Sequence, residues 1–160
     1  MSNQPYPAPS VVLPNETGKI IDLKNFRPNT IILFFYPRDN TSGCTREAKD
    51  FTENLKLFNK AKVTVIGVSK DSIESHEKFI KKQDLAITLL SDQDGSACED
   101  FGVWKEKSMY GKTYMGIERS TFIIDGQGLI IKEWRKVKVN GHVKEVLEVI
   151  ENHQKNGKLL

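Results

Sequence analysis

The sequence predicts an α/β fold in which helices flank a central sheet. An apolar run at residues 31–36 is rich in Ile and aromatic side chains, as is typical of a strand buried on both faces, and a second run at residues 63–68 predicts the next strand. An amphipathic segment follows each run, so strands and helices alternate along the chain. This alternation indicates right-handed crossovers and parallel pairing of the strands.

The N-terminal part of the chain precedes this alternation. Residues 11–13 and 19–23 flank a short turn sequence at residues 15–18, which predicts an N-terminal β-hairpin extension. Residues 1–8 are polar and proline-rich, and we expect them to form a loose arm. The first buried strand ends before Pro37, which has no backbone N–H to donate within a sheet.

The middle of the chain supplies most of the predicted helices. Thr41, Ser42 and Gly43 are start signals for a helix that we expect to run to about Asn59, with apolar side chains at helical spacing. Ser72 is the expected N-cap of the next helix. We expect that helix to end near Lys82. The elements predicted after it are a strand at residues 87–90, a turn at 91–95 and a short helix at 97–101.

The C-terminal part predicts an antiparallel pair of strands and a last helix. Residues 109–118 contain two glycines and are expected to be irregular. Residues 120–124 and 129–134 flank the sequence Asp-Gly-Gln-Gly, which is a hairpin signal. This pair would close one edge of the sheet and make the sheet mixed. Gly141 precedes the last helix, and residues 155–160 are expected to be loose.

Composition limits the class of protein. Residues 1–160 have the length of one domain, with 38% hydrophobic and 28% charged residues, as in ordinary globular proteins. A net charge of +3 is too small to indicate nucleic acid or a membrane as a partner. We expect no secretory signal and no transmembrane helix, because no apolar run is long enough. Two cysteines are too few for a disulfide scaffold, so we expect free thiols in a reducing cytoplasm.

Cys44 occupies a position that favours reactivity. It follows a buried strand and falls in the first turn of the predicted helix, where backbone N–H groups have no intrahelical partner and carry partial positive charge. Arg38 and Arg46 are nearby cations, and such surroundings stabilise a thiolate relative to a thiol. The alternative is that Cys44 is an inert, buried hydrophobic residue.

Two segments resemble known sequences. Phe35-Tyr36-Pro37, Thr41-Ser42-Gly43-Cys44-Thr45 and Glu47-Ala48 resemble the active-site segment of the peroxiredoxins, and most closely the bacterioferritin comigratory protein (peroxiredoxin Q) subgroup. Trp104-Lys105-Glu106-Lys107, Tyr110-Gly111-Lys112 and the run from Gly116 to Phe122 resemble the segment of the same subgroup that carries a catalytic arginine. The resemblance extends from about Pro9 to the last helix.

The resemblance implies a thioredoxin-like sandwich and a thiol-dependent peroxidase. Such an enzyme reduces hydrogen peroxide and organic hydroperoxides to water and alcohols through a sulfenic acid, here on Cys44. It also implies that Thr41 and Arg119 stabilise the departing oxygen and that Pro37 shields the pocket. Without the resemblance, Arg119 would be taken for a surface residue paired with Glu118 or Glu133. No cofactor and no metal ion are expected.

The resemblance leaves the fate of the sulfenic acid open. Many relatives carry a resolving cysteine where this chain has Lys49, and others carry one on the following helix, where this chain has none. We therefore expect a one-cysteine mechanism, in which thioredoxin, glutaredoxin or a small-molecule thiol reduces the sulfenic acid. A disulfide between Cys44 and Cys98 is the mechanistic variant. Relatives are often monomers, and we expect a monomer here.

Three other functions were weighed. A thioredoxin-type disulfide reductase needs a second cysteine three residues after the first, and this chain has Glu47 there. A binding module or redox sensor without peroxidase turnover is the alternative if Cys44 is inert. A metal site would have to use residues that lack the close spacing of structural zinc sites, namely Cys44, Cys98, His76, His142 and His153.

Overall fold

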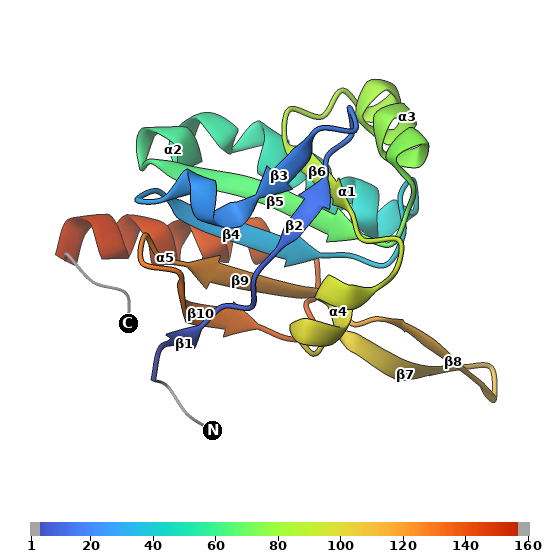
Figure 1. Ribbon diagram of the computed structural model, residues 1–160. Helices are drawn as coiled ribbons and strands as arrows, with labels where there is room; N and C mark the ends of the chain where they lie inside the picture. Colours follow the sequence, from blue (N-terminus) through green and yellow to red (C-terminus); the bar gives the residue numbers. More distant parts are fainter. Residues whose placement is uncertain (1–3, 157–160) are drawn as a thin grey trace.

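A six-stranded mixed sheet forms the centre of the computed structural model, which describes residues 4–156 (Figure 1). Strands β4, β5 and β6 pair in parallel, and β9 joins the other side of β4 in antiparallel orientation. The predicted α/β fold is therefore confirmed. The order across the sheet is β1 (Tyr6–Pro7), β10 (Leu129–Trp134), β9 (Ser120–Ile124), β4 (Thr30–Phe35), β5 (Val63–Ser69) and β6 (Thr88–Ser91).

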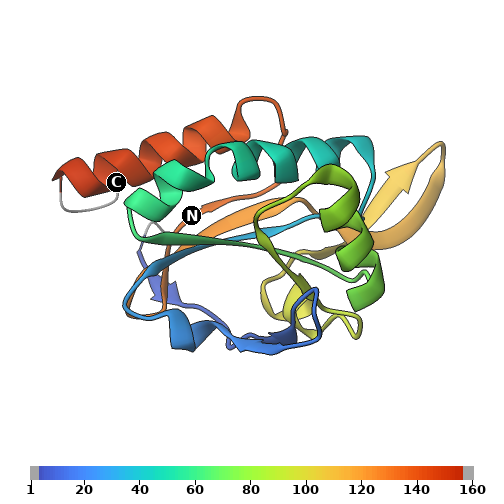
Figure 2. The same ribbon diagram turned by 90° about the horizontal axis from the view of Figure 1, so that it is seen from above.

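The helices cover the two faces of this sheet unequally. Figure 2 shows α1, α2 and α5 on one face, with the β2–β3 hairpin and α4 on the other. Since α3 contributes Phe79 to the same core as α1 and α5, it belongs to the first face. The remaining elements are β2 (Val12–Pro14), β3 (Ile20–Asp22), the 3-10 helix η1 (Leu23–Phe26), α1 (Ser42–Glu53), α2 (Leu55–Lys60), α3 (Ile73–Gln83), α4 (Ser96–Asp100), β7 (Trp104–Met109), β8 (Lys112–Ile117) and α5 (His142–Asn156).

Strand β4 separates two hydrophobic cores. Its side chains alternate, so that Ile32 and Phe34 enter the core beneath α1 and α5, whereas Leu33 and Phe35 enter the core beneath α4 and the N-terminal hairpin. All four are fully buried. Burial of each such side chain stabilises the fold by about 1.5–3 kcal/mol, which explains why every position of β4 after Thr30 is apolar.

The helix predicted to run to Asn59 is in fact two helices. Helix α1 ends at Glu53 and α2 begins at Leu55, so the prediction of one helix was wrong. The break lies at Asn54, whose side-chain amide donates to the carbonyl of Asp50 at 2.8 Å. An asparagine side chain that bonds to the backbone in this way competes with the helical hydrogen bonds.

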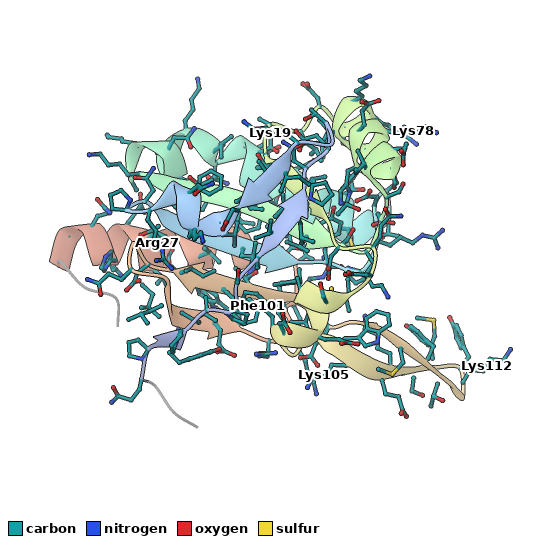
Figure 3. All side chains as sticks on the ribbon, viewed as in Figure 1. Lys19, Arg27, Lys78, Phe101, Lys105 and Lys112 are labelled. Atoms are coloured by element: carbon teal, nitrogen blue, oxygen red, sulfur yellow. The ribbon has the colours of Figure 1, made fainter. Side chains whose placement is uncertain are left out.

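The segment predicted to be irregular, residues 109–118, belongs to a β-hairpin that projects from the body of the molecule. Figure 3 shows Lys105 and Lys112 on this hairpin, where side chains spread into solvent. Strands β7 and β8 pair in register around Tyr110 and Gly111, both of which have positive φ, as a two-residue hairpin turn requires. The prediction failed because the strands lack an alternating apolar pattern, since only the base of the hairpin, at Trp104 and Ile117, packs on a core.

Two predictions at the ends of the chain also need correction. The β9–β10 pair forms as expected, but it does not close the sheet, because Tyr6–Pro7 of the expected loose arm pairs with β10. Backbone pairing is available there because the outer edge of β10 would otherwise expose unpaired groups. Helix α5 includes Lys155, which was expected to be loose, and residues 1–3 and 157–160 lie outside the described residues. Within the described part of the chain, no helix is both long and apolar enough to cross a membrane.

Candidate active site

Cys44 lies where the sequence placed it, in the first turn of α1. This helix begins at Ser42, immediately after the loop that leaves the carboxyl end of β4. Thr41 occupies the N-cap position with extended backbone, but its side chain does not cap the helix; its hydroxyl donates to the carbonyl of Arg38 at 2.8 Å. The N–H groups of the first turn are therefore not used by a capping side chain and can face an incoming oxygen.

Arg119 brings a positive charge to this turn from a distant part of the chain. It precedes β9, and its Nη2 donates to the sulfur of Cys44 at 3.4 Å, while its Nη1 donates to Oε1 of Glu47 at 2.7 Å. Burial acts to lower the pKa of Arg119, but the charges of Glu47 and Cys44 outweigh it and raise that pKa. Arg119 therefore pairs with Glu47 and not with Glu118 or Glu133, the partners expected without the resemblance.

Glu47 is a site residue that the sequence reasoning missed. It is 0% exposed, and its Oε2 has no hydrogen-bond partner in the described structure. Loss of hydration raises the pKa of Glu47 to about 7, because this effect exceeds the attraction of Arg119. The signal was present in the sequence: Glu47 lies on the buried face of α1 together with Cys44 and Ala48, where an acidic residue is unusual unless it has a partner.

Pro37 and Arg119 line one groove on the surface. The hairpin forms one side of this groove through Lys107 and Tyr114, and Val137 lies across from it. Burial lowers the pKa of Lys107, and the nearby positive charge of Arg119 lowers it further. The groove is thus lined by the positive charge of Arg119, which contacts Cys44. The side chain of Cys44 itself is almost completely buried, at 1% exposure.

Cys98 is not brought to Cys44. It lies on α4 in the core on the opposite face of the sheet and is 0% exposed. Both cysteines are free thiols. Burial, followed by the hydrogen bond and charge of Asp92, raises the pKa of Cys98 far above its ordinary value. Its environment is that of a structural thiol.

Among the described residues weighed for a metal site, His76 alone lies in a cluster of possible ligands. Its partners are Asp39 and Asp71, and their ligand atoms lie within 4.8 Å of one another. Hydrogen bonds within the cluster hold these three residues together. The sequence analysis did not point to either aspartate, because the two lie in loops that follow different strands.

Comparisons with known proteins agree with this geometry. Residues 6–133 match the AhpC/TSA family, and the chain therefore belongs to this family of peroxiredoxins, which are thiol peroxidases. The chain is 47% identical to the putative peroxiredoxin bcp of Coxiella burnetii over 140 residues, which cover 88% of this chain and 93% of the relative. It is also 47% identical to peroxiredoxin Bcp of Bacillus subtilis over 145 residues, covering 91% of this chain and 92% of that protein.

The similarity to solved structures places the chain in the Bcp, or peroxiredoxin Q, subgroup and confirms the thioredoxin-like fold. Peroxiredoxin Q of Xanthomonas campestris superposes with a TM-score of 0.85 at 43% identity, covering 89% of this chain and 90% of that chain. Another structure with a TM-score of 0.85 and 43% identity, covering 89% of this chain and 91% of that chain, was described in terms of the alkyl peroxide reduction activity of the Xanthomonas campestris bacterioferritin comigratory protein.

Proposed function

We propose that Cys44 is the peroxidatic cysteine of this peroxidase and that it reduces hydrogen peroxide and organic hydroperoxides, alkyl hydroperoxides among them. The observation that supports this most directly is the 3.4 Å contact from Arg119 Nη2 to Cys44 Sγ at an uncapped helix start. A cation and free N–H groups at this position are suited to bind an anionic oxygen.

In the proposed first step, the Cys44 thiolate attacks one oxygen of the peroxide. An S–O bond forms and the O–O bond breaks, so Cys44 becomes a sulfenic acid and the departing oxygen leaves as an alkoxide or hydroxide that takes up a proton. Charge develops on the departing oxygen in the transition state, and donors already in place stabilise it without reorganisation. Arg119 and the first N–H groups of α1 supply such donors.

Two further residues have supporting roles in this proposal. The Thr41 hydroxyl donates to the Arg38 carbonyl, which leaves its oxygen lone pairs available to accept from a peroxide O–H. Pro37 lines the groove next to Arg119 and limits the access of water. Tyr114 and Val137 add apolar surface along the same groove, which suits the carbon chain of an alkyl hydroperoxide.

The sulfenic acid is resolved by an external thiol in this proposal. That thiol attacks the sulfur, a mixed disulfide forms and water leaves; a second thiol then attacks the mixed disulfide and releases the Cys44 thiol. The central sheet lies between Cys44 and Cys98, and two cysteines that belong to different cores do not reach disulfide distance without large movement. Thioredoxin, glutaredoxin or a small-molecule thiol is the proposed reductant, in a monomer that works in the cytoplasm.

A single-turnover experiment tests the mechanism. Reduced protein is treated with one equivalent of peroxide, and intact mass is recorded with and without dimedone, which labels sulfenic acids. We expect a dimedone adduct on Cys44, with Cys98 still open to alkylation after unfolding. A disulfide between Cys44 and Cys98, absent in Cys98→Ser, would overturn the one-cysteine mechanism.

A steady-state experiment tests the peroxidase itself. Peroxide consumption with dithiothreitol is compared for the wild-type protein, Cys44→Ser and Cys98→Ser. Only Cys44→Ser should lose activity. If the wild-type protein reduces no peroxide with any thiol, the chain acts as a binding module or redox sensor instead.

A further inference from the structure

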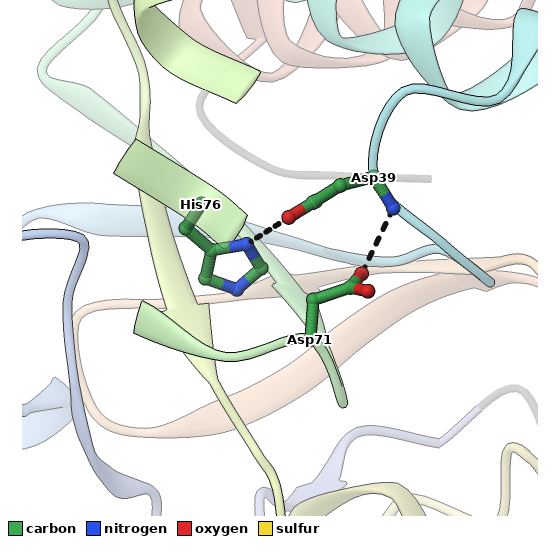
Figure 4. Close-up of side chains that lie close together, drawn as sticks. All are labelled: Asp39, Asp71 and His76. Carbon is green, nitrogen blue, oxygen red and sulfur yellow. Dashed lines mark hydrogen bonds and ion pairs between the residues drawn. The ribbon is translucent and has the colours of Figure 1, made fainter. Parts of the chain in front are cut away.

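A buried polar network holds the loop that leads into Cys44. The network consists of Tyr36, Asp39, Asp71, Ser75 and His76. Oδ2 of Asp39 accepts from His76 Nδ1 at 2.7 Å and from the Ser75 hydroxyl at 2.8 Å, and Oδ1 accepts from the Tyr36 hydroxyl at 2.7 Å. Figure 4 shows His76, on α3, pointing toward the carboxylate of Asp39, and Asp71 pointing toward the backbone nitrogen of Asp39. The side chains of Asp39 and His76 are 2% and 0% exposed.

The geometry indicates that Asp39 and His76 form an ion pair. His76 Nε2 lies 2.8 Å from the carbonyl oxygen of Leu90, which can only accept, so Nε2 carries a proton. Nδ1 faces a carboxylate that already accepts two hydroxyl hydrogens, so Nδ1 carries a proton as well. The imidazole is then an imidazolium. A divalent metal would need the Nδ1 lone pair that this hydrogen bond uses, so the network is better explained as an ion pair than as a metal site.

Asp71 attaches the same loop by its backbone. Its Oδ2 accepts from the backbone N–H of Asp39 at 2.8 Å and from the hydroxyl of Ser69 at 2.6 Å. The backbone carbonyl of Asp71 accepts in turn from the hydroxyl of Ser91. The loop after β4 is thereby fixed to the ends of β5 and β6.

This attachment bears on Cys44 because the loop and the helix start are continuous. Asp39 precedes the N-cap residue Thr41 by two positions, and Asn40 between them has φ of 61°, a left-handed conformation that asparagine adopts more readily than most residues other than glycine. Cys44 is 1% exposed, so an external thiol reaches its sulfur only after the loop or the first turn of α1 moves.

We propose that the Asp39–His76 ion pair keeps the loop at residues 37–41 and the first turn of α1 closed over Cys44, and that loss of the pair opens this segment to external thiols. The biological meaning of this proposal rests on the proposed function of Cys44. Its test does not, because alkylation of Cys44 is measured without any peroxide. His76 acts on Cys44 only through the loop and is a positioning residue.

Charge on His76 makes the closed segment sensitive to pH. Burial by itself lowers the pKa of His76, but the hydrogen bond and charge of Asp39 outweigh it and raise the pKa above its ordinary value. A raised histidine pKa means that the stabilisation is complete below the unfolded value of about 6.5 and is lost as pH rises through the folded value. The other titratable groups that face His76 are Asp39, Asp71 and Tyr36, and burial raises the pKa of Tyr36 well above its usual range.

Alkylation of the reduced protein measures opening without any peroxide. Iodoacetamide is added, the labelled Cys44 and Cys98 peptides are quantified by mass spectrometry, and the Cys44 rate is divided by the thiolate fraction measured by absorbance. Cys98 is the internal control, since it lies in the core on the other face of the sheet. We expect His76→Gln to raise the Cys44 rate roughly tenfold at neutral pH and to leave the Cys98 rate unchanged, as local opening requires.

The pH profile separates positioning from general loss of stability. The normalised Cys44 rate should rise with pH in the wild-type protein and be flat in His76→Gln. Ser75→Ala keeps the charges but removes one hydrogen bond to Asp39, and should raise the rate about twofold with the pH dependence retained. Val103→Ala, which weakens the opposite core, should not raise the Cys44 rate selectively.

Three results would overturn the proposal: an unchanged Cys44 rate in His76→Gln, a parallel rise at Cys98, or the same rise in Val103→Ala. If His76→Gln does not fold, Ser75→Ala and the wild-type pH profile still decide. If the alkylation rates are as expected but the protein has no peroxidase activity, this proposal stands and the proposed function is wrong. If the protein is an active peroxidase but the alkylation rates do not change as expected, the proposed function stands and this proposal is wrong.

Discussion

Cys44 and Cys98 occupy the same position in two helices but have neighbours of opposite charge. Each is the third residue of its helix, α1 or α4, and each is buried. At α4 the carboxylate of Asp92 accepts from the N–H groups of Ala97 and Cys98, at 3.1 and 2.8 Å. At α1 no side chain caps the helix, and Arg119 donates to the sulfur. The same position in a helix therefore gives two cysteines different surroundings, because the charge placed beside each sulfur has the opposite sign.

The two helix starts differ in whether a carboxylate accepts from their first N–H groups. Asp92 is buried and satisfies the N–H groups at the start of a short helix, so its negative charge stabilises α4 and disfavours a thiolate on Cys98. At the start of α1, no side chain accepts from the first N–H groups. The missing hydrogen bonds lower local stability, and two contacts in the surrounding structure offset this loss: the contact of Arg119 with Glu47 and the Asp39–His76 ion pair.

The largest expected effect comes from removing the positive charge at Cys44. Arg119→Met should slow the reaction with peroxide by about 10²–10³-fold, the usual effect of losing one donor to a developing oxyanion. Stopped-flow mixing of reduced protein with peroxide measures this rate. Arg135→Met is the matched control, because Arg135 pairs with Glu133 and packs over Phe122 in the other core. Equal rates for the two variants would contradict the role of Arg119.

A smaller effect is expected when Arg119 keeps its charge but loses its support. Glu47→Ala leaves the guanidinium without its 2.7 Å partner, and we expect the peroxide rate to fall about tenfold because the donor is no longer held in place. Glu47→Gln retains an oxygen acceptor and should lose less. If Ala and Gln behave alike, the charge of Glu47 and not its hydrogen bond is what matters.

The same residue predicts a dependence of stability on pH. Because the folded pKa of Glu47 is raised to about 7, its contribution to stability is greatest at low pH and is lost as pH rises through about 7. The unfolding free energy of the wild-type protein relative to Glu47→Gln should therefore decline between pH 4.5 and about pH 7 and level off above that. Urea denaturation of both proteins under reducing conditions measures the difference, and a constant difference would mean that Glu47 keeps one charge state throughout.

Removing the negative charge at Cys98 tests the other half of the comparison. Asp92→Asn should destabilise the fold by roughly 1–3 kcal/mol, since an amide accepts on one atom only and leaves one N–H of α4 without a partner. Alkylation of Cys98 should rise because the thiolate is less disfavoured. Peroxide reduction should not change, and a loss of activity beyond the loss of folded protein would connect α4 to the active site.

The smallest effect is expected from Cys98 itself. Cys98→Ala removes one buried atom and should cost about 1 kcal/mol of stability, while turnover with dithiothreitol stays within about twofold of the wild-type rate. Thermal unfolding and the peroxidase assay report the two quantities. Turnover that collapses in this variant would assign Cys98 a part in resolution.

Local sequence determined most of the elements and the position of Cys44. An apolar run long enough for a strand, a proline that ends it and start signals for a helix are all readable without tertiary contacts, and so is the parallel pairing that alternation implies. The polar β7–β8 hairpin was missed because its pairing leaves no apolar period. The break at Asn54 was missed because one amide side chain ended an otherwise continuous helical pattern.

Only the tertiary structure decided what surrounds each sulfur. Arg119 lies 75 residues from Cys44, and the resemblance, not the residue pattern, pointed to it. Glu47 was readable as an anomaly on an apolar helix face but acquired a partner only through the fold. Asp39 and His76 are 37 residues apart and meet because neighbouring parallel strands end at the same edge of the sheet. Periodicity in the sequence reports which face of a helix or strand is buried. The charged residue that contacts a buried group comes from elsewhere in the chain, so such a contact leaves no pattern in the local sequence.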